Sequence, residues 1–295
     1  MTSSQARPRG FGCFEQAVVH AASGDSAYPA QLREIPSPPK SLWFVGRLPA
    51  QEEKLLAIVG ARAATRAGCD CARAIATGLG QGGASIVSGG AFGIDAAAHE
   101  GALASGVPTF AVLGCGTDVT YPDRHADLFA RVAASGGLLS EYPPGTPPRA
   151  CQFPARNRII AGLARAVIVV EAALHSGALI TARLGHKLGR ILFAVPGSPG
   201  TDAYLRAGLA LPATSAADIE RVLAGGPACA TVPPAPEPLL PILDAIARGA
   251  DTPAILCRHL GVSLPSIMAT LAEAELEGLV RRAAGNIYEV IGRAC

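Results

Sequence analysis

The residues best suited to chemistry in this chain lie between Ala84 and His99, in the sequence ASIVSGGAFGIDAAAH. The apolar run at its start predicts a strand, and the alanine-rich run at its end predicts a helix with Asp95 in the first turn. The glycines between them lack a Cβ, so backbone N–H groups can approach a ligand, and a helix N-terminus carries about half a positive charge. The stretch therefore predicts an anion site for a nucleotide or a nucleic acid, unless the glycines only make a tight connection. The residues concerned are Ser88, Gly89, Gly90 and Gly93.

A catalytic site would need a positioned acid or base. Asp95 and His99 lie four residues apart on the predicted helix and share one face, as an acid–base pair would. An aspartate in the first turn of a helix is, however, favoured by the helix dipole in any case. We therefore predict no catalytic residues. The scattered cysteines give no metal-binding spacing such as C-x-x-C, so we expect neither a metal nor another cofactor.

The overall charge shows no polyanion-binding tail. The 295 residues carry a net charge of +2, so any site for nucleic acid must be local. Of the 25 basic residues only Lys40, Lys54 and Lys187 are lysines, and arginine is the side chain that grips phosphates in a bidentate manner. The sequence shows neither a signal peptide nor an apolar run of membrane-spanning length, and its eight cysteines form no disulfide framework. We expect a cytoplasmic protein with reduced thiols and no membrane partner.

Short apolar runs alternate with helical stretches between residues 55 and 225. The predicted strands lie at residues 55–59, 84–87, 108–113, 137–139, 166–170, 191–195 and, more weakly, 209–211. The predicted helices lie at residues 68–79, 94–104, 124–134, 156–163, 176–188 and 215–223. The strands are apolar throughout, which indicates burial on both faces. We predict an α/β fold, a parallel sheet with helices on both faces that binds ligands at the carboxyl ends of its strands.

Polar residues follow several strand ends and would gather along one edge of this sheet. Arg62 follows the first predicted strand, while Ser176, Gly177 and Thr181 follow the fifth and begin a helix. Together with the glycine turn they form the predicted site.

The segment FPARNR places Arg156, Asn157 and Arg158 in the first turn of another helix. Positive charge at that position opposes the helix dipole, so an anionic partner is the explanation that we prefer. The alternative is a salt bridge to Glu141 or Glu171.

The regions outside this domain differ from it in composition. Residues 1–54 are a lead-in segment with several prolines, which we expect to pack against the domain rather than to form one. Residues 226–238 are a proline-rich linker, and residues 239–295 show three helical patterns followed by a hairpin with Gly285 and Asn286 at its turn. This order is typical of a small winged-helix domain. Its third helix carries glutamates and no Arg or Lys, so we expect protein docking or self-regulation there rather than reading of duplex DNA.

Several motifs together resemble the DprA/Smf family, over about residues 28–223. They are VGAR at 59–62, SGGAFGIDAAAH at 88–99, LGCGTDVTYP at 113–122, SEYPPGTPP at 140–148, FPARNRIIAGL at 153–163 and VVEAALHSGALITARLG at 169–185. The resemblance implies a Rossmann-like fold that binds single-stranded DNA, forms a homodimer, protects incoming DNA and loads RecA during natural transformation. The residues that we expect at the DNA are Arg62, Ser88, Gly89, Gly90, Phe92, Gly93, Arg156, Asn157, Arg158, Ser176, Gly177 and Thr181.

The chain departs from the family pattern in three places. Phe92 stands where the family usually has a basic residue, so a phosphate contact is either missing or replaced by a ring on which a base could stack. The alternative is that Phe92 packs into the core. The loop after Ser198 is shorter than in the family, with Asp202 in the position of an asparagine. The longer members of the family carry an N-terminal helical domain, for which we expect about the first 25 residues of this chain to be too few.

The shortened loop also suggests a different class of function. Its sequence PGSPGT, residues 196–201, resembles the PGGxGT motif of the lysine-decarboxylase-like phosphoribohydrolases, which share a related fold. Those enzymes need a glutamate three residues after the threonine, where this chain has Tyr204. Without a placed carboxylate, hydrolysis of an N-glycosidic bond lacks an acid or a nucleophile. We therefore prefer a DNA-binding protein without enzymatic activity. A nucleotide-processing enzyme and a sensor of small nucleotides are the two alternatives.

Overall fold

The computed structural model describes residues 17–174, 176–228, 240–247, 249–276 and 279–290. The main feature of this part of the chain is a nine-stranded sheet with the order β1-β2-β6-β5-β4-β3-β7-β8-β9. The strands are β1 (Val19–Ala22), β2 (Ser41–Gly46), β3 (Leu55–Val59), β4 (Ser85–Ser88), β5 (Thr109–Val112), β6 (Gly137–Ser140), β7 (Ala166–Val169), β8 (Ile191–Ala194) and β9 (Leu211–Pro212). Neighbours from β6 to β9 in this order are parallel, whereas β1 pairs with β2 and β2 pairs with β6 in antiparallel fashion.

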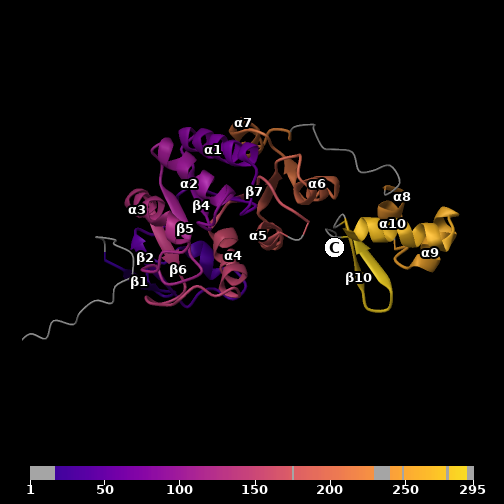
Figure 1. The fold of residues 1–295 in the computed structure, drawn as a ribbon, viewed down its shortest axis with the longest axis horizontal. Helices are drawn as coiled ribbons and strands as arrows, with labels where there is room; N and C mark the ends of the chain where they lie inside the picture. Colours follow the sequence, from indigo (N-terminus) through magenta and orange to yellow (C-terminus); the bar gives the residue numbers. More distant parts are fainter. Residues whose placement is uncertain (1–16, 175, 229–239, 248, 277–278, 291–295) are drawn as a thin grey trace, which may run out of the picture.

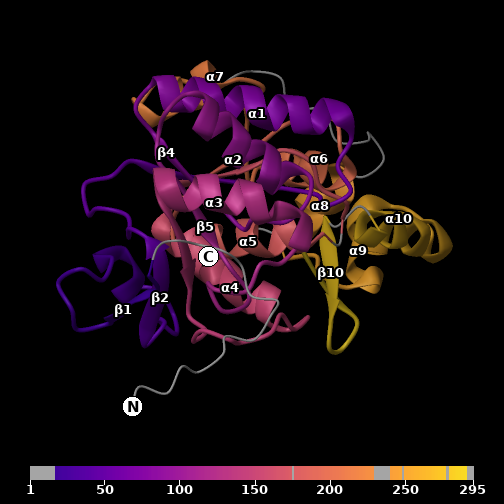
Figure 2. The same cartoon turned by 60° about the vertical axis from the view of Figure 1, so that its left-hand side comes forward.

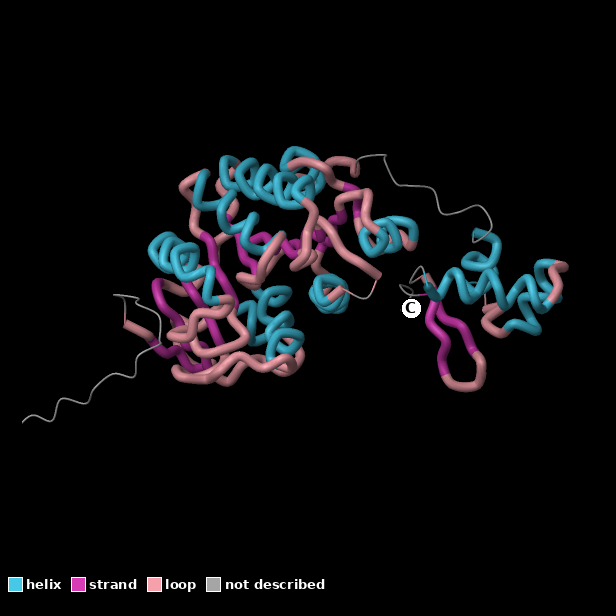
Figure 3. The backbone as a smooth tube through the Cα atoms, viewed as in Figure 1, coloured by secondary structure: helices cyan, strands magenta, loops and turns pink. Residues whose placement is uncertain are grey.

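Helices cover both faces of the sheet, with α1 and α7 above it and α4 and α5 below it in the view of Figure 1. They are η1 (Ala30–Arg33), α1 (Arg66–Gln81), α2 (Ile94–Ala104), η2 (Asp123–His125), α3 (Ala126–Ser135), α4 (Gln152–Leu163), α5 (Gly177–Lys187), α6 (Pro199–Arg206) and α7 (Ala216–Leu223). Figure 3 shows the strands enclosed between these two helical layers. The predicted fold class, a mostly parallel sheet with helices on both faces, is confirmed.

Strand β3 shows why the apolar runs of this chain become central strands. All its residues are buried. Leu56 and Ile58 join the apolar core under α1 and α2, whereas Leu55, Ala57 and Val59 join the core under α4 and α5. A strand that packs against helices on both sides has no solvent face, so its sequence cannot alternate between apolar and polar residues. The carboxyl end of β3 leads directly to Gly60, in the middle of the sheet.

The lead-in segment does more than pack against the domain, because it extends the sheet. Strands β1 and β2 form the antiparallel margin seen in Figure 2, and β2 pairs with β6 over residues 43–46 and 137–140. Leu42 and Val45 of β2 are completely buried, as is Leu32 of η1. The prolines around these short runs concealed them, since a strand at a sheet margin can be bounded by proline on either side.

The shortened loop after Ser198 contains a helix that the sequence analysis missed. Helix α6 starts with Pro199 at its first position, which suits proline because the first N–H of a helix needs no internal acceptor. Gly197 at φ +112° makes the sharp turn into it. The backbone N–H of Gly197 donates to Asp202 Oδ1 over 2.8 Å, so the helix holds its own entry turn.

The C-terminal region has the predicted order of three helices and a hairpin. The elements are α8 (Leu240–Ala247), α9 (Pro253–Leu260), α10 (Leu264–Leu276), β10 (Val280–Ala283) and β11 (Ile287–Val290). The hairpin loop consists of the three residues between Ala283 and Ile287, and two of them, Gly285 and Asn286, have positive φ, as tight hairpin loops commonly require. Most of the predicted linker and residues 1–16 lie outside the described residues.

Two helices of this region, α9 and α10, are apolar and follow each other closely, so we compared them with the length and composition of a membrane-spanning helix. Within the described residues, no single helix is long and apolar enough to cross a membrane. Helices α9 and α10 together would pass on length and composition, but they meet at an angle of 113°. The helices of this region bury apolar side chains against one another, among them Ile242, Ala245, Leu256, Ile267, Leu271 and Ala274.

Candidate functional site

A pocket of about 430 Å³ opens at the carboxyl edge of the sheet, where β3 ends and where α4 and α5 begin. A smaller hollow of about 50 Å³ adjoins it and shares several of its residues. Of the residues that we predicted at the DNA, the larger pocket is lined by Arg62, Arg156, Asn157, Ser176, Gly177 and Thr181. The smaller hollow adds Gly89, Gly90 and Phe92. Ser88, Gly93 and Arg158 line neither.

The glycine turn after β4 already holds an anion of its own. The Asp95 carboxylate accepts hydrogen bonds from the backbone N–H groups of Gly89 (3.1 Å) and Ala91 (3.3 Å). The carboxylate therefore uses the N–H of Gly89, one of the donors that we expected to face a phosphate, together with the N–H of Ala91. Burial raises the pKa of Asp95, while Arg156 and these hydrogen bonds act in the opposite direction.

Ser88 and Gly93 serve the architecture of this turn. The buried Ser88 hydroxyl donates to the carbonyl of Ile58 on the neighbouring strand over 2.6 Å. Gly93 has φ +74°, and a Cβ there would lie 2.3 Å from the carbonyl oxygen of Ala61. Both residues thus hold β4 and the start of α2 against the end of β3.

Arg156 is a buried cation at the floor of the site. Its side chain donates to the carbonyl of Gly89 over 2.6 Å and also to the carbonyl of Val112 at the end of β5. A Cβ on Gly89 would meet both Asp95 Oδ2 and Arg156 Nη2 within 2.7 Å, so only glycine fits between the two charges. Burial lowers the pKa of Arg156 to about 10, and the nearby Asp95 counteracts this effect. At neutral pH the Arg156 guanidinium therefore remains charged.

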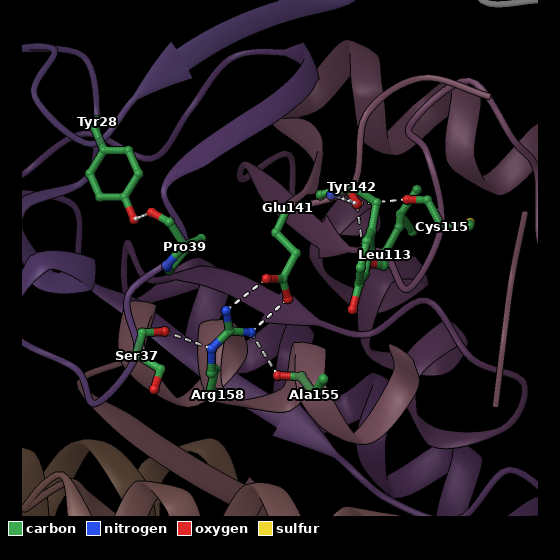
Figure 4. A network of polar contacts seen from close by, with 10 residues as sticks. Tyr28, Ser37, Pro39, Leu113, Cys115, Glu141, Tyr142, Ala155 and Arg158 are labelled. Carbon is green, nitrogen blue, oxygen red and sulfur yellow. Dashed lines mark hydrogen bonds and ion pairs between the residues drawn. The ribbon is translucent and has the colours of Figure 1, made fainter. Parts of the chain in front are cut away.

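Arg158 is committed to an ion pair, which was our alternative interpretation (Figure 4). Its Nη1 and Nη2 atoms donate to the two carboxylate oxygens of Glu141 over 2.6 and 2.7 Å. It also donates to the carbonyls of Ser37 and Ala155 over 2.9 and 2.8 Å. The hydrogen bonds that Arg158 donates to Glu141 raise the pKa of Arg158. Because it follows Arg156 by two positions on α4, its side chain points toward the lead-in segment instead of the pocket.

Arg62 is the exposed cation at the mouth of the pocket. Its guanidinium carbon lies 5.1 Å from the centre of the Phe153 ring, and the centres of the Tyr121 and Phe153 rings are 5.4 Å apart. Among the described residues Arg62 takes part in no ion pair. A guanidinium held on an aromatic ring keeps its donors free for a phosphate, so Arg62 is the strongest phosphate-binding candidate.

The N-terminus of α5 forms the opposite wall. Ser176 caps the helix by accepting from the N–H of Ala178 over 3.2 Å. The Asn157 amide donates to the carbonyl of Gly177 over 3.3 Å, which ties α4 to α5. Thr181, one turn further along, is buried and lines the pocket. The wall thus presents polar groups and the positive end of a helix.

Phe92 projects from the glycine turn with 43% of its surface exposed. The alternative that it packs into the core is therefore wrong. Its ring meets His125 edge-on at a centroid distance of 4.7 Å. His125 was not predicted at the site, and Tyr121 and Phe153 entered the prediction only as parts of motifs. The one signal in the sequence that could have indicated these aromatic residues is that they lie close to the motifs that follow strand ends.

Of the residues suggested for enzymatic chemistry, Asp95 lines the larger pocket, where it accepts from the glycine turn, and the others lie elsewhere. His99 is completely buried and lines neither hollow, and its Nδ1 contacts Thr109 Oγ1 at 2.8 Å. The PGSPGT turn is closed on itself: Ser198 Oγ accepts from Ala172 N over 3.0 Å and lies 2.6 Å from Thr201 Oγ1. None of residues 196–204 lines either hollow. Among the described residues, no group of three or more His, Cys, Asp or Glu could hold a metal ion.

The β10–β11 hairpin carries two exposed basic residues, Arg281 and Arg282. Arg281 donates to Glu289 across the hairpin over 2.6 Å. Helix α10 carries the exposed Glu273 and Glu275 and no basic residue. An acidic helix repels a phosphate backbone, and protein docking at this helix stays a prediction.

The sequence was compared with family models and with known proteins, and both comparisons indicate the same family. The sequence matches the family described as DNA recombination-mediator protein A over residues 20–223, and the DprA winged helix domain over residues 226–286. It is 37% identical to the protein Smf of Escherichia coli K12 over 302 residues, which cover 95% of this chain and 80% of that protein. It is 49% identical to Smf of Synechocystis over 179 residues, 59% of this chain and only 45% of that protein.

A solved structure agrees with these matches. DNA processing protein A of Helicobacter pylori superposes with a TM-score of 0.65 at 31% identity, covering 72% of this chain and 97% of that one. The fold, the order of the site motifs and both family matches agree. This chain therefore belongs to the DNA recombination-mediator protein A family, the DprA/Smf family of DNA processing proteins.

Proposed function

We propose that this protein binds single-stranded DNA along the mouth of the pocket at the carboxyl edge of the sheet. The observation that carries the proposal is Arg62, an exposed cation that lies on the Phe153 ring above a pocket whose floor is the buried Arg156. Proteins that bind a single strand combine cations with aromatic rings, because the cations bind the phosphates and the rings stack on the bases. The Helicobacter pylori relative is described by its single-stranded DNA binding mode, which supports the same ligand here.

The roles of the predicted residues differ in this proposal. Arg62 contacts a phosphate directly, and the N-terminus of α5 with Ser176 and Gly177 offers further donors. Arg156 and Asp95 shape the glycine turn, and Arg156 supplies positive charge without leaving its carbonyl acceptors. Arg158 has no direct role at the DNA, because Glu141 already neutralises it.

The wider role that we propose is that of a recombination mediator. In it the protein acts as a homodimer, protects single-stranded DNA that enters the cell during natural transformation, and loads RecA onto it. The family description as a recombination mediator supports this role. We further propose that the protein acts without catalysis, since no residue of the PGSPGT turn reaches the pocket.

A salt-dependent titration with oligo-dT tests the site. We expect Arg62→Ala to weaken binding and to reduce the slope of log K against log salt by about 0.7, the value for one phosphate on a single strand. Arg66→Ala is the matched control, because Arg66 is almost fully exposed, lies on α1, and lines neither hollow. Equal slopes for wild type and Arg62→Ala would place the DNA elsewhere. Release of a free base from nucleoside monophosphates would indicate the enzymatic alternative instead.

A further inference from the structure

Three aromatic rings run in series from the surface at the glycine turn into the core. Phe92 is 43% exposed, His125 is 8% exposed and Phe129 is completely buried. The Phe92 and His125 rings meet at 4.7 Å with an interplanar angle of 73°, and the His125 and Phe129 rings meet at 5.7 Å and 80°. Both contacts are edge-to-face, the arrangement that aromatic pairs prefer.

His125 also binds the backbone of the glycine turn. Its Nδ1 lies 3.1 Å from the carbonyl oxygen of Gly90, which requires a proton on Nδ1. Gly90 has φ +68°, and a Cβ there would lie 2.8 Å from the Phe129 ring. The turn, the histidine and the buried phenylalanine are therefore packed as one unit. His125 comes from η2, after the strand next to the glycine turn, so it joins two loops of the site.

The exposed face of Phe92 looks onto the same hollow as Arg62 and Tyr121. Exposure of an apolar ring to water is unfavourable, and stacking of a second flat ring on Phe92 would remove this apolar surface from solvent. A nucleobase is the flat ring that a single strand offers next to its phosphates.

We propose that His125 is a positioning residue that holds Phe92 ready to stack on a base of the bound strand. The proposal rests on the proposed function and adds to it a contact with bases at a place where Arg62 contacts a phosphate. A ring fixed before binding loses less rotational freedom on binding, so the edge contact and the hydrogen bond to Gly90 strengthen the stacking. His125 itself does not touch the DNA.

A double-mutant cycle on the full chain tests this role, with oligo-dT and an abasic strand of equal length as probes. We expect Phe92→Ala to weaken oligo-dT binding by roughly 5- to 100-fold, the range for the loss of one stacked base, with an unchanged salt slope. We expect His125→Leu to weaken it by about two- to tenfold, which corresponds to freeing one side chain. In the Phe92→Ala background, His125→Leu should have no further effect, and neither change should alter binding of the abasic strand.

Two controls separate the possible outcomes. His20→Leu changes an exposed histidine on β1, at the far margin of the sheet, and should leave affinity unchanged. If His125→Leu does not fold, His125→Phe replaces it in the cycle, because it keeps a ring against Phe92 and loses only the hydrogen bond to Gly90. Equal effects of the His125 change with and without Phe92 would overturn the inference. Absence of salt-dependent oligo-dT binding by the wild type would overturn the proposed function itself.

Discussion

Acid should destabilise this protein through His99, a histidine that becomes protonated in the folded protein only near pH 3. His99 lies on α2 and is completely buried, and its Nδ1 lies 2.8 Å from the Thr109 hydroxyl oxygen. That hydroxyl donates its own proton to the carbonyl of Ile86 over 3.1 Å, so it accepts from Nδ1–H. A second proton would go to Nε2, which has no hydrogen-bond partner among the described residues. Burial first, and then the charges of His125 and Arg156, lower the pKa of His99 to about 3.

The size of the effect follows from this pKa. The unfolded chain takes up a proton on His99 near pH 6.5, whereas the folded protein takes it up only near pH 3. Stability from this residue is therefore complete above pH 6.5 and is lost as the pH falls toward 3. At pH 4.5 the difference of two units below 6.5 corresponds to about 2.7 kcal/mol, at 1.36 kcal/mol per unit. The full shift corresponds to an upper limit of about 5 kcal/mol.

The assay compares urea unfolding of the wild type and His99→Asn at pH 7.5 and pH 4.5. Other groups also titrate in acid, so the informative quantity is the change in the difference between the two proteins. We expect His99→Asn to be less stable at pH 7.5, since it leaves part of the ring's volume empty, and to lose about 2 to 3 kcal/mol less than the wild type on going to pH 4.5. His20→Asn, at an exposed histidine, should follow the wild type. Parallel losses in wild type and His99→Asn would refute the reasoning.

Three further predictions concern the arginines of α4 and the C-terminal region. Arg158→Ala should lower the free energy of unfolding by about 1 to 3 kcal/mol, because the half-buried Glu141 loses its partner, yet leave the salt slope of oligo-dT binding unchanged; a smaller slope would mean that Arg158 does contact DNA. Arg156→Ala should cost about 3 to 5 kcal/mol in urea unfolding, because the buried Asp95 is left without its counter-charge; a stability close to wild type would show that the Arg156 contacts are dispensable. A chain that ends at Gly226 should retain most of its affinity for oligo-dT by anisotropy, and loss of nearly all affinity in a folded truncated chain would show that the winged helix binds DNA.

The arginines of α4 show where prediction of the site from sequence ends. Arg156 and Arg158 stand two residues apart in the same motif, and no local pattern distinguishes them. On a helix two positions turn a side chain by about 200°, so one points into the pocket and the other toward Glu141 at the end of β6. The ion pair with Glu141 was foreseeable only as an alternative. The role of Asp95 as the anion of the glycine turn was not foreseen, because the spacing alone cannot tell an internal carboxylate from a bound phosphate.

The sequence by itself determined the elements whose signals are local. The continuous apolar run of β3 indicates burial on both faces, and Ile94 to Ala104 becomes a helix with the predicted bounds. The hairpin turn follows from Gly285 and Asn286, since these residue types tolerate positive φ. Such features depend on backbone sterics and on the period of hydrophobicity, which neighbouring residues carry within a few positions.

Tertiary structure alone decided which groups remain free for a ligand. Whether Arg62 is free and Arg158 is paired depends on Phe153 and Glu141, residues brought close by the packing of α4 against the ends of the strands. The same holds for β2, whose short run becomes a strand because β6 offers it hydrogen bonds across about 95 residues of sequence. A charge or a polar backbone group takes whichever partner the fold places within reach, and distance along the chain does not reveal that partner.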